Sequence, residues 1–170
     1  MPHPATSRRL KSAGILLFRH RDGSTEVLLG HPGGPYWARK DEGAWMVPKG
    51  AVEEGESALE AAVREFGEEV GPVPAGLPVP LATVRQNGGK LVEVFALEGD
   101  FDPGTLKSNL FELEWPPRSG RMQSFPELDQ VAWMNLEEAR RRILKSQLPL
   151  LDAFVALAGG KEEQGTGERK

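Results

Sequence analysis

Three glutamates in one short stretch, Glu65, Glu68 and Glu69, are the residues whose type and spacing point most directly to chemistry. In a helix, residues three and four apart are neighbours, so Glu65 faces both other acids, and each like-charge pair costs about 0.2–0.5 kcal/mol. Arg64 can relieve part of this repulsion by pairing with Glu60 or Glu68. The remainder favours a bound hard cation such as Mg²⁺. The alternative is a solvated acidic face of a helix.

The residues around these acids predict one short helix. Ser57 and Glu60 have the spacing of a capping box, which places the helix start at Ser57. Gly71 followed by Pro72 ends it. Apolar residues at spacings of three and four give the helix a face to bury against a core, while the acids lie on another face. These apolar residues are Leu59, Ala62, Val63, Phe66 and Val70.

A longer pattern of fixed positions frames the helix. It reads Gly50, five residues, Glu56, seven residues, Arg64-Glu65-Phe66, one residue, Glu68-Glu69, one residue, Gly71. This pattern resembles the signature of the Nudix hydrolases, which cleave nucleoside diphosphates linked to another group. Every charged and glycine position of that signature is present. Phe66 and Pro72 stand where the family usually has aliphatic residues, which we interpret as changes in packing.

The resemblance implies a metal site with supporting residues. The implied cofactor is Mg²⁺, with Mn²⁺ as a substitute, and the supporting pair that orients the ligands from behind is Arg64 with Glu56. The implied metal ligands are the backbone carbonyl of Gly50 and the carboxylates of Glu65, Glu68 and Glu69.

An additional acid follows from the same resemblance. Glu127 lies six residues before Trp133, and in several branches of the family an acid at this offset adds a carboxylate to the metal cluster. Asp129 is a second candidate for this role, and a structural role for Glu127 at a turn is the alternative. The catalytic general base is either Glu65 or Glu127. Crowded carboxylates raise one another's pKa while a bound metal lowers it, so the sequence leaves this choice open.

Several features suggest a substrate. The Trp-x-x-Pro-Lys-Gly sequence that ends at Gly50 resembles that of the diadenosine polyphosphate hydrolases, and this implies that Lys49 approaches phosphate rather than lying solvated at a turn. We therefore expect Mg²⁺-dependent hydrolysis of a diadenosine polyphosphate. One alternative is a mutator-type nucleoside triphosphate pyrophosphohydrolase. Another, from a different class, is a regulatory module that binds a nucleotide without cleaving it.

Two long loops carry further candidates for substrate binding. Residues 116–126 contain Arg118 and Arg121, whose guanidinium groups suit bidentate contact with phosphate, or which serve only as surface charges. Residues 31–43 are rich in Gly and Pro, and this loop carries three rings that can stack on a base or pack among themselves. These rings belong to His31, Tyr36 and Trp37.

Composition limits the class of protein. The 170 residues suit one domain, which we place at 11–158 between a flexible arm (1–10) and a disordered tail (159–170). A net charge of −4 argues against a protein that grips long nucleic acid, and leaves a small nucleotide as partner. The sequence lacks an apolar run long enough for a membrane span or a signal peptide, which favours the cytoplasm. The absence of cysteine excludes disulfides, and the oligomeric state, monomer or homodimer, stays open.

The expected elements are strands at 12–19, 26–30 and 45–49, the helix from Ser57, two strands joined by Asn87-Gly-Gly89, a strand at 110–115, and helices from Asn135 to about Ser146 and from Pro149 to Ala158. This order predicts the α/β class, with helices packed against a mixed sheet. It also resembles the Nudix fold, an α/β/α sandwich with a mixed β-sheet.

Overall fold

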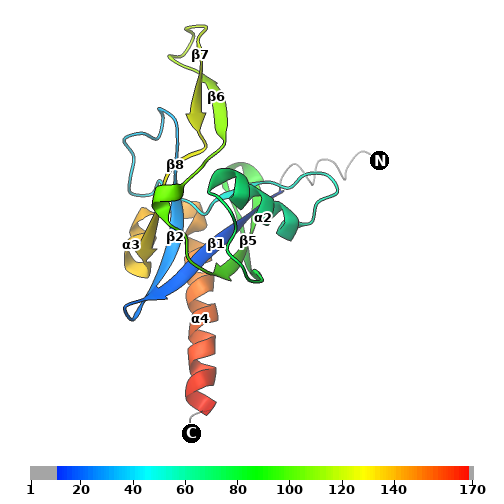
Figure 1. Ribbon diagram of the computed structural model, residues 1–170, viewed down its shortest axis with the longest axis vertical. Helices are drawn as coiled ribbons and strands as arrows, with labels where there is room; N and C mark the ends of the chain where they lie inside the picture. The colour runs from blue at the N-terminus through cyan, green and yellow to red at the C-terminus, as the bar shows by residue number, and fades with distance from the viewer. Residues whose placement is uncertain (1–10, 169–170) are drawn as a thin grey trace.

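The computed structural model describes residues 11–168 and shows a mixed sheet between helices (Figure 1). The strands are β1 (Lys11–Arg21), β2 (Ser24–Pro32), β3 (Lys49–Ala51), β4 (Val79–Arg85), β5 (Leu91–Glu98), β6 (Leu110–Glu114), β7 (Met122–Pro126) and β8 (Leu128–Asn135). The helices are α2 (Ala58–Glu69), α3 (Leu136–Arg142) and α4 (Leu148–Glu168), with short 3-10 turns η1 (Asn87–Gly89), η2 (Pro103–Thr105) and η3 (Lys145–Gln147).

The main sheet has the strand order β4-β5-β1-β2-β8, and β3 pairs with β1. β1 and β5 are parallel, whereas the other pairs are antiparallel, so the predicted mixed sheet is confirmed. The Asn87-Gly-Gly turn joins β4 to β5 as an antiparallel pair, which confirms the predicted hairpin.

The two faces of the sheet bury different clusters. Along β1, the alternate residues Ile15 and Leu17 pack with Phe66 of α2, and Leu16 packs on the other face with Phe154 of α4. Alternation along a strand therefore sends neighbouring apolar side chains into two cores. Helices cover both faces, and the predicted α/β/α sandwich is confirmed.

The segment before α2 differs from the strand expected at 45–49. Trp45 and Met46 each form an isolated bridge, to Ile143 and Gly30, and regular pairing begins only at Lys49. Pro48 lacks the backbone N–H that a continuous ladder needs.

A separate two-stranded sheet, β6 with β7, corrects the loop expected at 116–126. Met122–Pro126 forms β7 and pairs with β6 from Leu110↔Pro126 to Glu114↔Met122. Only the residues between β6 and β7 form the turn. In Figure 1 this hairpin projects from the body at the end opposite α4.

The last helices begin as predicted but end elsewhere. The Asn135 side chain accepts a hydrogen bond from the Glu138 amide and caps α3, which confirms its predicted start. α3 ends at Arg142 rather than near Ser146, because the next residues pair with Trp45.

α4 continues past Ala158 to Glu168, where the sequence predicts a disordered tail, and helix-forming residues at 161–164 suit this extension. The predicted arm, residues 1–10, lies outside the described residues. Within 11–168, no helix has both the length and the apolar character that a membrane span requires.

Candidate functional site

α2 positions the acidic residues through a local cap. The Ser57 hydroxyl accepts from the Glu60 amide at 3.1 Å, and the Glu60 carboxylate accepts from the Ser57 amide at 2.8 Å. The predicted capping box is thus confirmed. Phe66 is buried against the sheet, which turns the acids on other faces of the helix away from the core. Because the cap engages Glu60, Arg64 turns to other partners.

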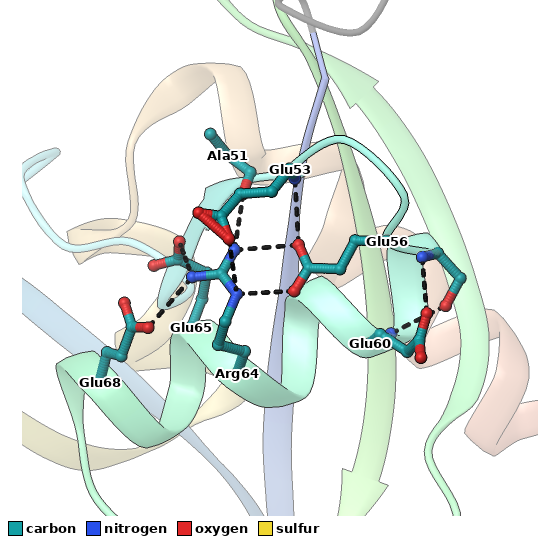
Figure 2. A network of polar contacts seen from close by, with 8 residues as sticks. Ala51, Glu53, Glu56, Glu60, Arg64, Glu65 and Glu68 are labelled. Atoms are coloured by element: carbon teal, nitrogen blue, oxygen red, sulfur yellow. Dashed lines mark hydrogen bonds and ion pairs between the residues drawn. The ribbon is translucent and has the colours of Figure 1, made fainter.

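Arg64 lies at the centre of a network of carboxylates (Figure 2). It donates two hydrogen bonds to Glu56, at 2.6 and 3.0 Å, in the bidentate geometry that suits a guanidinium. It also donates to Glu65 at 3.0 Å, to Glu68 at 3.1 Å and to the Ala51 carbonyl at 3.0 Å. One side chain therefore ties the start of the motif to two successive turns of α2.

The contacts of Arg64 fix the charge state of its main partner. Its hydrogen bonds, together with one from the Glu53 amide, hold the pKa of Glu56 below the ordinary value. The same interactions raise the pKa of Arg64. On this side of the site one guanidinium is shared among three carboxylates.

A second group of charges lies on the other side of Glu65. Burial, then the negative charge of Glu65 and a hydrogen bond to it, raise the pKa of Glu69 to about 8, while Lys49 opposes this shift. Burial lowers the pKa of Lys49, against the pull of Glu69, Glu127 and Glu65. Partial burial and the charge of Glu65 likewise raise the pKa of Glu127. These four residues therefore lie within electrostatic reach of one another.

Gly50 brings the backbone against this cluster. It pairs with Ala13 of β1, and a β-carbon at Gly50 would overlap the carboxyl group of Glu65. Only glycine lets the chain pass so close to that carboxylate. The predicted backbone ligand and one predicted side-chain ligand are therefore adjacent.

The donor set fits a hard divalent cation. In the part of the chain that the structure describes, no three acidic or histidine side chains already converge on one point. Glu65 and Glu68 instead contact Arg64, and Glu69 hydrogen-bonds to Glu65. Burial and the neighbouring Glu65 carboxylate raise the pKa of Glu69 to about 8. Added positive charge beside these two carboxyl groups would therefore be favourable. Oxygen ligands of this kind suit Mg²⁺.

Glu127 is held by its backbone between β7 and β8. Its N–H donates to the Asn109 carbonyl at 2.8 Å, and its carbonyl accepts from the Gly33 amide at 3.0 Å. The other candidate, Asp129, instead contacts Nδ1 of His31 at 2.8 Å, and Nε2 of the same ring contacts the Lys40 carbonyl at 2.6 Å. The structure therefore brings Glu127 toward the cluster and ties Asp129 to His31.

The aromatic candidates of the first loop are largely used in packing. His31 is buried and holds the loop as described. Trp37 is half-buried against the core on the α4 side, and Nζ of Lys40 lies 4.9 Å from its ring centroid. Tyr36 stays exposed but contacts Trp115 of the hairpin, with ring centroids 5.1 Å apart.

Arg118 and Arg121 are exposed in the turn between β6 and β7. Figure 1 shows this turn at the far end of the projecting hairpin, so the structure does not bring the two arginines beside the glutamates. Their predicted contact with substrate stays a prediction that requires a ligand long enough to reach them.

Sequence reasoning gave no role to Gln147. The structure buries it completely and places its side-chain oxygen 2.9 Å from the Val47 amide, 100 residues away. The only signal in the sequence is a polar residue just before the apolar start of a helix.

A family model and two known proteins match the sequence of this chain. The family model of the NUDIX domain matches residues 8–154. An RNA pyrophosphohydrolase of Aeromonas hydrophila is 26% identical over 156 residues, covering 81% of this chain and 89% of that protein. One of Halorhodospira halophila is 52% identical over 50 residues, which span 29% of this chain and 28% of that relative.

Solved structures share the fold. The Ap4A hydrolase of C. elegans, in a binary complex, superposes with a TM-score of 0.62 at 24% identity, covering 88% of this chain and 98% of that one. The E. coli ORF135 protein superposes with a TM-score of 0.53 at 27% identity, covering 88% and 92%.

Proposed function

The chain belongs to the Nudix family, and on that premise we propose that it hydrolyses a phosphoanhydride bond of a nucleotide with Mg²⁺. The observation that carries this proposal is the packing of Gly50 against the Glu65 carboxylate, with Glu68 on the same Arg64 side chain and Glu69, Glu127 and Lys49 within electrostatic reach. Members of the family use divalent metal ions and act on small nucleotides. When bound, such ions neutralise phosphate oxygens and lower the pKa of a water nucleophile.

The residues of the chain divide the remaining work. The metal would be held by the Gly50 carbonyl and by the carboxylates of Glu65, Glu68, Glu69 and Glu127. Arg64 with Glu56 fixes the orientation of the ligands on α2. A carboxylate, Glu65 or Glu127, accepts the proton of the attacking water. Lys49 contributes a positive charge to the phosphate beside the cluster.

For the substrate we propose a diadenosine polyphosphate. The projecting hairpin supports a ligand with a long phosphate chain, because its turn carries Arg118 and Arg121, two exposed guanidinium groups that suit phosphate beyond the glutamates. Trp37 belongs to the loop beside this hairpin and is the proposed aromatic contact of the substrate.

A second candidate is the 5′ end of RNA, since the two curated relatives described above are named RNA pyrophosphohydrolases. Both candidates carry a nucleotide beyond the phosphates. They differ in the product that is released.

A product screen with Mg²⁺ tests the proposal. The purified protein is incubated with diadenosine tetra-, penta- and hexaphosphate, nucleoside triphosphates, ADP-ribose and 5′-triphosphorylated RNA, and the products are separated by ion-exchange chromatography. We expect ATP from the diadenosine polyphosphates. Pyrophosphate from RNA alone would favour the second candidate, and monophosphate plus pyrophosphate from free triphosphates would favour a mutator-type enzyme.

Tight binding without turnover would contradict hydrolysis and support a regulatory module. The Glu68→Gln variant separates metal binding from nucleotide binding. If this variant hydrolysed the substrate at the parent's rate, the assignment of Glu68 as a metal ligand would be wrong.

A further inference from the structure

Gln147 connects the helical side of the molecule to the chain that enters the site. It ends η3, just before α4, and is completely buried. Its Oε1 accepts a hydrogen bond from the Val47 amide at 2.9 Å. Its Nε2 is also buried and has no hydrogen-bond partner among the described residues. The side chain thus makes one hydrogen bond with its oxygen and leaves its nitrogen unused.

The segment that receives this hydrogen bond is fixed at several points. Val47 lies between the isolated bridges and β3, so no strand partner accepts its N–H, and a side chain does so instead. The backbone of its neighbours is tied to the rest of the fold by five hydrogen bonds between backbone groups: Trp45 N–H to the Arg142 carbonyl at 3.0 Å, Leu144 N–H to the Trp45 carbonyl at 2.8 Å, Met46 with Gly30 at 2.8 and 2.9 Å, and Ile15 N–H to the Pro48 carbonyl at 3.3 Å.

The position of this segment sets the position of the site. Lys49 and Gly50 follow Val47 by two and three residues. Gly14 of β1 lies so close to Pro48 and Lys49 that a β-carbon there would overlap both, and Gly50 is equally close to Glu65. Since the chain has no free space on either side, a shift at Val47 moves Lys49 and the Gly50 carbonyl relative to the carboxylates.

The buried amide also has a cost. An unpaired N–H₂ group in an apolar cluster destabilises the folded state, and an apolar side chain of similar shape avoids that loss. A glutamine therefore serves this place poorly as core filling and well as an acceptor for Val47. Resting on the proposed function, we propose that Gln147 is a positioning residue of the hydrolytic site, which acts through the Val47 amide on Lys49 and the Gly50 carbonyl.

The Gln147→Met variant tests this role, because methionine has a similar length but lacks a strong acceptor. Its stability should fall below that of the parent, because the buried Val47 N–H loses its acceptor and the removal of the unpaired N–H₂ offsets only part of that loss. We expect faster hydrogen exchange at the Val47 amide. We also expect Mg²⁺ affinity, measured by calorimetry, and kcat to fall about 10- to 100-fold, as for residues that orient metal ligands.

Two further variants provide the controls. Gln147→Glu keeps an oxygen at the acceptor position, and burial favours the neutral acid there; it should lose stability but keep Val47 protection and Mg²⁺ affinity close to the parent's. Phe154→Leu removes volume from the same core cluster, on α4, where Phe154 packs on Phe18 with ring centroids 4.9 Å apart. It should lose stability while keeping Mg²⁺ affinity and kcat.

Each outcome decides the inference. The proposal would be overturned if Gln147→Met left Val47 exchange and Mg²⁺ affinity unchanged. It would also be overturned if the losses of stability, Mg²⁺ affinity and kcat in Gln147→Met matched those in Phe154→Leu. If Gln147→Met does not fold, a folded Gln147→Glu that exchanges Val47 rapidly or binds Mg²⁺ weakly contradicts it. If the parent hydrolyses none of the screened substrates, the proposed function fails, but the exchange and Mg²⁺ measurements still decide the role of Gln147.

Discussion

The two sides of Glu65 contain the same kinds of residue in opposite electrostatic states. On one side, Arg64 satisfies Glu56, Glu65 and Glu68 at 2.6–3.1 Å, and the pKa of Glu56 is lowered. On the other, Lys49 is the cation among several carboxylates, and the pKa of Glu69 rises to about 8. The pKa values of Glu56 and Glu69 move in opposite directions because Glu69 is buried beside Glu65, whereas Glu56 accepts hydrogen bonds from Arg64.

We interpret this difference as a division between a scaffold and the proposed reactive centre. On the Arg64 side each carboxylate accepts a hydrogen bond from the guanidinium, which ties α2 to the start of the motif at Ala51 and Glu56. The Lys49 side is incomplete, so it gains most from added positive charge. Perturbed acids that are clustered with a lysine are typical of functional sites.

The largest predicted effect comes from the residue shared by both sides. Glu65→Gln removes the charge that meets Arg64 and Glu69 together, and we expect kcat to fall about 10²- to 10⁴-fold, the range for a positioned acid or base. Steady-state hydrolysis with Mg²⁺ measures it. Glu112→Gln, on an exposed position of β6, is the matched control and should keep the parent's rate. A Glu65→Gln rate within tenfold of the parent would exclude a role in catalysis.

The Arg64→Met variant removes the hydrogen bonds and the charge that Arg64 gives to its carboxylate partners. Three carboxylates lose their partner, and we expect a loss of about 1–3 kcal/mol in the free energy of unfolding, less than for a fully buried pair because the Arg64 side chain is 27% exposed. Urea denaturation measures this loss. Arg64→Lys keeps the charge but not the bidentate contact, and should lie between parent and Arg64→Met. Equal stability of all three proteins would contradict the scaffold role.

The incomplete side predicts a pH dependence of stability. The folded state holds the Glu69 proton up to about pH 8, whereas an ordinary glutamate releases it near pH 4.5. The contribution of protonated Glu69 to the free energy of unfolding is therefore fully present below pH 4.5 and is lost as pH rises to about 8. We expect the metal-free protein to lose on the order of 1–2 kcal/mol over this range, since Glu69 is half-buried and partly screened by water.

Thermal unfolding in a chelator measures this effect, at about 2–4 °C in Tm per kcal/mol for a chain of this size. Glu69→Gln should flatten the profile, and Mg²⁺ should stabilise the parent most at the upper end of the range. A flat profile in the metal-free parent would show that the second side of Glu65 is not short of positive charge.

The smallest effect is expected at the β6–β7 hairpin, which belongs to neither group of charges around Glu65. Arg118→Ala and Arg121→Ala should raise KM for diadenosine tetraphosphate by less than about tenfold with kcat unchanged, because exposed charges are screened, and added salt should reduce the difference further. Kinetics at low and high ionic strength measure this. A fall in kcat would place the turn in the reactive centre instead.

Local sequence predicted the scaffold well. Ser57 and Glu60 form a capping box of four residues that specifies the start of α2. Asn87-Gly-Gly specifies the turn between β4 and β5 by its backbone preference. β7 escaped prediction because Met122–Pro126 is short, ends in proline and lacks an alternating apolar face, so only its pairing with β6 defines it.

The second side of Glu65 depends on contacts that a local pattern does not contain. Lys49 is half-buried because β3 pairs with β1 beside α2, and the burial of Glu69 follows from the same packing. The contacts from Gln147 to Val47 and from His31 to Asp129 join residues 100 and 98 positions apart. Residue type suggested candidates there, and only the fold determined their partners.

The hairpin has a consequence for how the molecule can change. Asn109, at its base, donates its N–H to the Glu68 carbonyl at 2.9 Å and accepts from the Glu127 amide at 2.8 Å, so backbone hydrogen bonds join the base to the proposed reactive centre. Backbone hydrogen bonds place few demands on residue type, and the tip makes its turn in solvent. We therefore expect insertions, deletions or exchange of the tip to leave the acids in place, which makes this hairpin a suitable site for a library that varies nucleotide preference.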